Sequence, residues 1–178
     1  MVDDNYDFLF IGDHTHAVDT KNRVSIPSSF RRNFPSGTED YLVLLRGATG
    51  CIEAHVRPEW RLFVQRLRSL GRYNKEDLIL RRLLLSGSTE IQLDGQMRVL
   101  LPKKLTELAG IGAEARFIGQ GSFFEIWNPQ QFDEFVVQNS PLYDELIQRL
   151  DGGRAVEEKA VERGGQDQRG VPSAGNVP

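Results

Sequence analysis

Short stretches of alternating hydrophobic and polar residues recur along the chain, and this alternation predicts β-strands. Val18, and then Val24 and Ile26, lie on either side of a polar Asp-Thr-Lys-Asn turn, a pattern typical of a β-hairpin. Further apolar stretches joined by Gly-containing loops predict two more hairpins: Tyr41–Leu45 with Cys51–Ala54, and Ala115–Ile118 with Phe123–Ile126.

Apolar residues at helical spacing follow each of these strand groups. After Pro58 the spacing of Trp60, Phe63, Val64, Leu67 and Leu70 predicts an amphipathic helix. The other predicted helices are Lys75–Leu85, Lys103–Ala109 with Gly110 as its stop, a helix after Pro129 and a closing helix over 142–150.

An internal repeat organises these elements. The segment Asp19–Pro27 matches Asp94–Pro102 at an offset of 75, with Asp, Arg, Val and Pro at the same spacing. Downstream, Cys51–His55 matches Phe123–Trp127, and a proline that opens a helical pattern follows each. Each copy therefore predicts two strands, a short helix, two strands and a longer helix, which is an α+β architecture.

The total charge by itself argues against a nucleic-acid partner, because the 178 residues contain 22 Lys and Arg and 25 Asp and Glu. The charge is unevenly placed, however. Residues 1–13 carry −4, residues 14–116 carry +6 and residues 117–178 carry −5. A basic block thus lies between two acidic flanks, and nucleic acid remains a possible partner.

The remaining composition bounds the class of protein. Hydrophobic residues make up 39% of the chain, enough for a sizeable core, without an apolar run of the ~20 residues that a membrane span needs. The acidic N-terminus does not resemble a secretion signal, and a single cysteine fits a reducing cytoplasm. Residues 151–178 contain six Gly and no Leu, Ile or aromatic residue, which predicts a disordered tail.

The two Asp-x-x-x-Arg turns are the candidate chemistry, and two interpretations are open. Asp19 and Asp94 can accept hydrogen bonds from backbone N–H groups of their turns and so form them. Arg23 and Arg98 can pair with these aspartates, which would make them structural. Pointed outward instead, each guanidinium offers a planar fork to a phosphate or a guanine edge.

Metal-binding and enzymatic alternatives are weaker. His14, His16 and Asp19 could be imagined as metal ligands, but a site needs three or four ligands with supporting contacts, and polar residues on a hairpin edge explain them better. Cys51 and His55 lie ~13 Å apart if both are on one strand, too far for a nucleophile and its base, so Cys51 is predicted to be a buried core residue. The sequence predicts no catalytic residue, no metal, no cofactor and no small-molecule substrate.

The paired motifs resemble those of the MraZ family. They are Asp19-x-Lys-x-Arg-x-x-x-Pro27, Asp94-Gly-x-x-Arg-x-x-x-Pro102, Arg81-Arg-Leu-Leu-Leu85, Phe10-x-Gly12, and Gly119-Gln-x-x-x-Phe-Glu-x-Trp127. The resemblance covers about residues 8–150. It implies two SpoVT/AbrB-like swapped-hairpin units that form a pseudo-dimeric β-barrel within one chain, with flanking helices.

The resemblance also implies a function. Members of this family are bacterial regulators that assemble into homo-oligomeric rings and bind short direct repeats in promoter DNA. They usually repress the division and cell-wall gene cluster together with their own gene, in the cytoplasm at the nucleoid. The family's DNA-contacting positions fall on Lys21, Arg23 and Arg98. We add Arg31, Arg32, Lys103 and Lys104 as basic neighbours and Pro27 and Pro102 as turn-forming residues.

Two departures affect the turns. The family usually has Gly before the arginine, where this chain has Asn22 and Met97. Asn tolerates a left-handed backbone, whereas Met fits one poorly. We therefore expect the second loop to turn differently and to contact DNA less than the first.

The sequence thus predicts a DNA-binding transcriptional regulator without a membrane partner. The alternative is an oligomeric protein-interaction scaffold whose Asp–Arg turns are purely structural. The expected division is a flexible acidic N-terminus at 1–7, a first repeat at 8–56, linking helices at 57–86, a second repeat at 87–128, C-terminal helices at 129–150 and the tail at 151–178.

Overall fold

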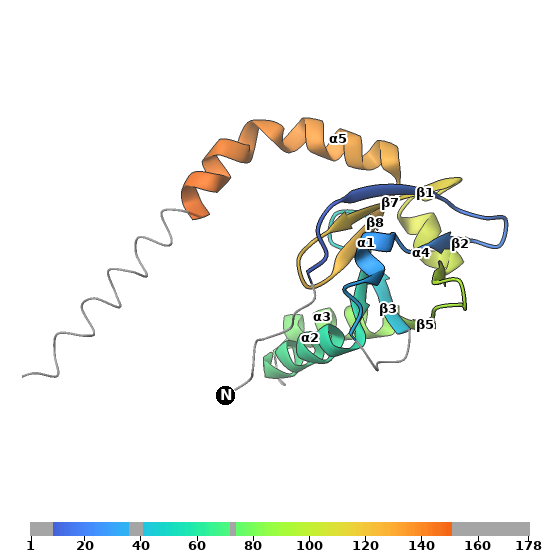
Figure 1. Ribbon diagram of the computed structural model, residues 1–178. Coiled ribbons are helices and arrows are strands. Elements are labelled where there is room, and N and C mark those ends of the chain that lie inside the picture. The colour runs from blue at the N-terminus through green and yellow to red at the C-terminus, as the bar shows by residue number, and fades with distance from the viewer. Residues whose placement is uncertain (1–8, 36–40, 72–73, 151–178) are drawn as a thin grey trace, which may run out of the picture. The chain divides into compact units, whose positions relative to one another are not determined.

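A computed structural model describes residues 9–35, 41–71 and 74–150 of the chain (Figure 1). The chain divides after Asp133 into two compact units. The predicted flexible N-terminus at 1–7 and the predicted tail at 151–178 lie outside the described residues. Within them, no helix is both long and apolar enough to cross a membrane.

Both repeats build the same series of elements, as the sequence predicts. The first contains β1 (Asp13–Ala17), β2 (Arg23–Ser25), α1 (Ser28–Arg31), β3 (Tyr41–Arg46), β4 (Ile52–Val56) and α2 (Arg57–Ser69). Helix α3 (Lys75–Gly87) follows. The second contains β5 (Thr89–Gln92), β6 (Arg98–Leu100), α4 (Lys103–Leu108), β7 (Glu114–Gly119), β8 (Phe124–Trp127) and α5 (Pro129–Asn139).

The two repeats exchange their first hairpins. The larger sheet has the order β1-β7-β8-β4-β3-β5, so β1 of the first repeat pairs with the second repeat and β5 of the second pairs with the first. Strands β2 and β6, again one from each repeat, form a separate antiparallel ribbon. The swapped-hairpin, pseudo-dimeric α+β fold is thereby confirmed.

Strand register places equivalent residues opposite each other at the centre of both sheets. Val24 faces Val99 in the β2–β6 ribbon, and Glu53 faces Glu125 where β4 pairs with β8. These are the positions that the internal repeat aligns. The two copies are therefore related by an approximate twofold axis, which places their turns in equivalent surroundings.

A single core fills the space between the sheets and the short helices. Val24, Ile26, Val99 and Leu101 are all at most 1% exposed, and with them Phe30 packs inward from α1. The alternation of apolar and polar residues in the sequence thus correctly predicts which side chains of each strand face inward. Cys51 is also buried, as predicted, at 2% exposure.

The short helices begin where the sequence places them. Pro27 and Pro102 precede the first turns of α1 and α4, because proline has the backbone angle of a helix start and lacks only an N–H that would be unpaired there. Gly110, at φ 60°, follows α4. The predicted Lys103–Ala109 helix differs from α4 by one residue.

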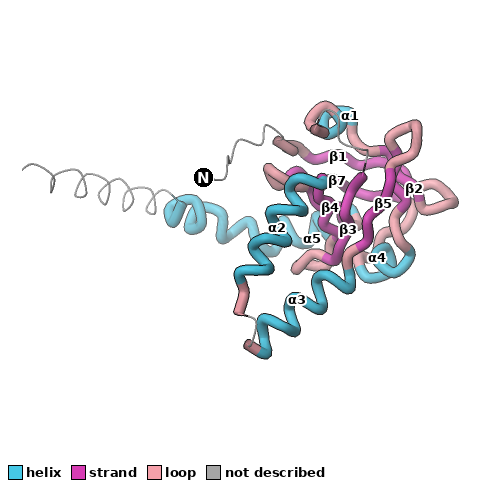
Figure 2. The backbone as a smooth tube through the Cα atoms, turned by 90° about the horizontal axis from the view of Figure 1, so that it is seen from below, coloured by secondary structure: helices cyan, strands magenta, loops and turns pink. Residues whose placement is uncertain are grey.

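Helices α2 and α3 form a pair beside β3 and β4 (Figure 2). Asn74 caps α3 by accepting hydrogen bonds from the N–H groups of Glu76 and Asp77. Arg81 donates from α3 to the backbone carbonyls of Leu67 and Leu70 at the end of α2. The predicted Lys75–Leu85 helix extends two residues further than expected, to Gly87.

The second compact unit begins at Glu134, within α5. A 3₁₀ turn at Ser140–Leu142 interrupts the helical course, which resumes over residues 143–150. The closing helix predicted over 142–150 is confirmed, apart from this turn at its start.

Candidate nucleic-acid interface

The first Asp-x-x-x-Arg turn is held by one carboxylate. Asp19 Oδ1 accepts hydrogen bonds from the backbone N–H groups of Lys21 (2.8 Å) and Arg23 (2.9 Å). The main chain closes the same turn, because the N–H of Asn22 donates to the Asp19 carbonyl at 2.9 Å. Asn22 has φ 59°, the left-handed conformation that asparagine tolerates.

The second turn has the same geometry. Asp94 Oδ1 accepts from the N–H groups of Gln96 (2.9 Å) and Arg98 (3.1 Å), and the N–H of Met97 donates to the Asp94 carbonyl at 2.8 Å. Met97 has φ 56°, so the expectation that it would make the second loop turn differently is wrong. Its side chain packs against the core, and its carbonyl accepts from Ile26, which together hold the left-handed backbone.

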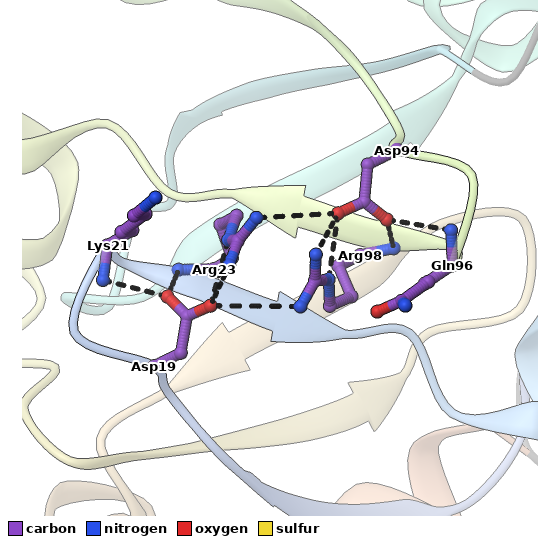
Figure 3. A network of polar contacts seen from close by, with 6 residues as sticks. All are labelled: Asp19, Lys21, Arg23, Asp94, Gln96 and Arg98. Atoms are coloured by element: carbon purple, nitrogen blue, oxygen red, sulfur yellow. Dashed lines mark hydrogen bonds and ion pairs between the residues drawn. The ribbon is translucent and has the colours of Figure 1, made fainter.

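The two turns meet in a ring of four charges (Figure 3). Arg23 donates to Asp19 Oδ2 from Nε (2.8 Å) and Nη2 (2.7 Å), and Arg98 binds Asp94 Oδ2 in the same way, at 2.7 Å from both nitrogens. Each Nη1 faces the aspartate of the other repeat, at 4.0 Å for Arg23 and 3.9 Å for Arg98. Of the two interpretations of the arginines, the structure has the paired one.

The arginines hold both aspartates in their charged form. Hydrogen bonds from the Arg23 side chain and backbone lower the pKa of Asp19 from 3.8 to about 2. The Arg98 side chain, followed by the backbone N–H groups of Arg98 and Gln96, lowers the pKa of Asp94 to about 2 as well. The ring of two arginines and two aspartates is therefore neutral overall at physiological pH.

The pairing still leaves part of each arginine accessible. The Arg23 side chain is 32% exposed and that of Arg98 is 25% exposed. Since Nη1 lies beyond hydrogen-bond distance from the facing carboxylate, it retains donor capacity toward a ligand at the surface. The aspartates fix the guanidinium planes, so such a ligand meets a pre-oriented group.

The other predicted basic residues lie on the short helices, with different surroundings. Lys104 and Arg32 are exposed, and Lys103 is exposed with its Nζ 3.7 Å from Glu107. Arg31 is half-buried, and its Nε donates to the carbonyl of Ile26 at 2.7 Å. Arg31 therefore has a structural contact at the end of β2, and the other three are the more accessible cations.

Sequence reasoning missed Gln96. It occupies the position in the second turn that Lys21 occupies in the first, and both residues are exposed. The sequence prediction rests on basic residues, which leaves this neutral side chain out. The offset of 75 between the repeats identifies Gln96 as the equivalent of Lys21.

Asp13, His14 and His16, which the motifs do not explain, have structural partners. Arg116 binds Asp13 Oδ1 from Nε at 2.7 Å and also pairs with Asp133, which joins β1, β7 and the start of α5. His14 contacts Ser29 Oγ through Nε2 at 2.9 Å, and His16 Nδ1 donates to the Ser25 carbonyl at 2.8 Å. Among the described residues no group of three His, Cys, Asp or Glu is arranged to hold a metal ion.

Fold and site together define a class: a single-chain pseudo-dimer of swapped hairpins with two adjoining Asp–Arg turns. Residues 9–83 and 84–149 each match the family model described as "MraZ protein, putative antitoxin-like". The chain belongs to the MraZ family.

Relatives named "Transcriptional regulator MraZ" match most of the chain. The protein of Alkaliphilus oremlandii is 34% identical over 142 residues, which is 80% of this chain and 96% of the relative. That of Clostridium acetobutylicum is 37% identical over 71% of this chain and 87% of its own length. The Coxiella burnetii protein is 32% identical over 80% of this chain and 97% of its own.

Proposed function

We propose that this protein is a transcriptional regulator that binds double-stranded promoter DNA through its two Asp–Arg turns. The observation that carries the proposal is the juxtaposition of the turns: β2 and β6 pair, and each Arg Nη1 comes within 4.0 Å of the other repeat's aspartate. Two equivalent loops thus present one continuous surface, which suits a repetitive polymer such as DNA. The names of the relatives, "Transcriptional regulator MraZ", support the same class of function.

The charge of this surface assigns different roles to its residues. Because the Asp–Arg ring is neutral, it contributes little net attraction to phosphates and instead orients Arg23 and Arg98 toward them or toward guanine edges. The net positive charge comes from Lys21 in the first turn and from the exposed cations of the short helices, Lys103, Lys104 and Arg32. Affinity is therefore expected to depend on salt through these cations.

The finer function follows the family. We propose binding to short direct repeats in the promoter of the division and cell-wall gene cluster, repression of that cluster and of the protein's own gene, and assembly as a homo-oligomeric ring at the nucleoid in the cytoplasm. A ring brings several pairs of loops to successive repeats, so avidity adds affinity without new contacts.

One observation favours the alternative of a protein-interaction scaffold. Arg23 and Arg98 each already donate from two nitrogens to an aspartate of the same Asp–Arg ring. If no DNA contact is made, the turns serve only to join the two repeats.

The affinity of single-lysine variants for the protein's own promoter fragment distinguishes these functions. We expect Lys21→Ala and Lys104→Ala each to weaken binding several-fold and to lower the slope of log K against log salt by about one. Lys75→Ala is the matched control, because Lys75 is an exposed lysine at the start of α3, away from β2 (Figure 2). Equal affinities for all four proteins would favour the scaffold.

A further inference from the structure

The outer face of the β2–β6 ribbon carries an apolar side chain that the core does not use. Val24 and Val99, at the centre of the ribbon, are 0% exposed, whereas Leu100 is 49% exposed. Because successive residues of a strand point to opposite faces, Leu100 lies on the face that carries Arg23 and Arg98. This is the face that we propose to meet DNA.

Strand register places Leu100 beside one of the two arginines. Leu100 is directly opposite Arg23 across the ribbon. The N–H of Leu101 donates to the Asn22 carbonyl at 2.9 Å, so the hydrogen bonds of the ribbon lie on either side of the Arg23–Leu100 pair. Side chains at such a position lie close together, with Cβ atoms about 5 Å apart. The guanidinium group and the leucine side chain therefore form adjacent parts of one surface.

The second arginine has a different neighbour. Arg98 is opposite Ser25, the residue that the offset of 75 aligns with Leu100. Both arginines make the same contacts with their own aspartates, so the two ends of the ribbon differ in this neighbour and not in the pairing. The ribbon thus has one apolar and one polar end. A surface with two different ends suits a direct repeat, because a direct repeat has no twofold symmetry.

The side chains at the apolar end match one feature of DNA. A two-stranded ribbon fits the major groove, where an arginine binds O6 and N7 of guanine and an apolar side chain contacts the 5-methyl group of thymine. A phosphate offers nothing to a leucine, so the exposure of Leu100 on this face points to a base. Ser25 offers a hydroxyl group instead, which does not select for a methyl group.

We propose that Leu100 contacts the 5-methyl group of a thymine next to the base that Arg23 contacts. The Arg23–Leu100 end of the ribbon then requires this methyl group, and the Arg98–Ser25 end does not. The inference rests on the proposed function, because it assigns a base preference to the surface that we propose to bind DNA. It makes Leu100 a residue that determines specificity, whereas the surrounding lysines attract any sequence.

Uracil in place of thymine tests this contact, because the exchange removes only the methyl group. The protein's own promoter fragment is prepared with uracil at one thymine of a repeat at a time, and the affinity of the full chain is measured by fluorescence anisotropy. We expect uracil at the contacted position to weaken binding by the wild type about fourfold, which corresponds to one buried methyl group. Uracil at the other positions should change the affinity by less than about twofold.

Variants at position 100 assign the effect to its side chain. Leu100→Ser gives both ends of the ribbon the same side chain and should bind the thymine and uracil fragments equally. Leu100→Met keeps an apolar side chain and should retain the difference. Leu108→Ser is the matched control, because Leu108 is also 49% exposed but is the last residue of α4, and it should discriminate like the wild type. A Leu100→Ser protein that still discriminates about fourfold would overturn the proposal.

The outcomes separate this inference from the proposed function. A wild-type protein that binds the promoter fragment equally well whichever thymine is replaced would refute the contact with Leu100 and leave DNA binding standing. A wild-type protein that does not bind the fragment would refute both.

Discussion

At the residue scale, the two turns are formed by the same set of local hydrogen bonds. One carboxylate oxygen of each aspartate accepts two backbone N–H groups, and the other binds the arginine four positions later. The motif Asp-x-x-x-Arg could be read from the sequence as a turn. Whether its arginine pairs with the aspartate or points outward could not be predicted, because the spacing of the two residues is the same in both orientations.

The lowered aspartate pKa values predict how stability depends on pH. A carboxyl group whose pKa falls from 3.8 in the unfolded chain to about 2 in the fold stabilises the native state when ionised. That contribution is present in full above about pH 4 and is lost as the pH falls to about 2. Asp19→Asn should therefore lower the free energy of unfolding at pH 7, measured by urea denaturation, and the difference from wild type should vanish near pH 2. A difference that is the same at both pH values would contradict the pairing.

The left-handed residues predict which substitutions the turns tolerate. Asn22→Val and Met97→Val should each cost about 1–2 kcal/mol, because a β-branched side chain opposes the positive φ of both positions. Asn22→Gly is the control and should change stability by less than about 0.5 kcal/mol. Thermal unfolding measures all three. A Val variant as stable as wild type would mean that the turn differs from the one described.

At the element scale, the sequence predicts the strands and helices well but not their partners. The alternation along β2 and the repeat of its pattern in β6 identify both strands. The exchange of hairpins, with β1 on β7 and β5 on β3, depends on contacts between residues 45 or more positions apart that no local pattern encodes. The expectation for Met97 is wrong for a different reason. Met disfavours a left-handed backbone, but core packing and the hydrogen bond from the Ile26 N–H override that preference.

One glycine, Gly119, lies where β7 comes very close to the backbone of Phe10. A Cβ added to Gly119 in β7 would lie 2.2 Å from the carbonyl oxygen of Phe10, a backbone atom that cannot move aside freely. Gly119→Ala should therefore lower the free energy of unfolding by about 2 kcal/mol or more. Gly112→Ala, with no atom within 4 Å of the added Cβ, is the matched control and should unfold like the wild type. Equal stability of the two variants would contradict the packing of Phe10 against β7.

At the scale of the whole molecule, affinity depends on how many loop pairs act together. One chain offers a single neutral Asp–Arg ring with Lys21 beside it (Figure 3), which suits weak binding. In the proposed homo-oligomeric ring of subunits, each added operator repeat engages another pair of loops within the same complex. A promoter fragment with two correctly phased repeats should bind at least about 10²-fold more tightly than one repeat, measured by fluorescence anisotropy. Binding independent of repeat number would contradict the avidity that we propose.

The most direct test of the central proposal is photocrosslinking from the loops to promoter DNA. A photoreactive amino acid is placed at position 21, at the equivalent position 96, or at position 75 as a control on α3. We predict adducts from positions 21 and 96 that map to the direct repeats, and none from position 75. Adducts that form equally from all three positions, or from position 75 alone, would contradict DNA binding through the two Asp–Arg turns.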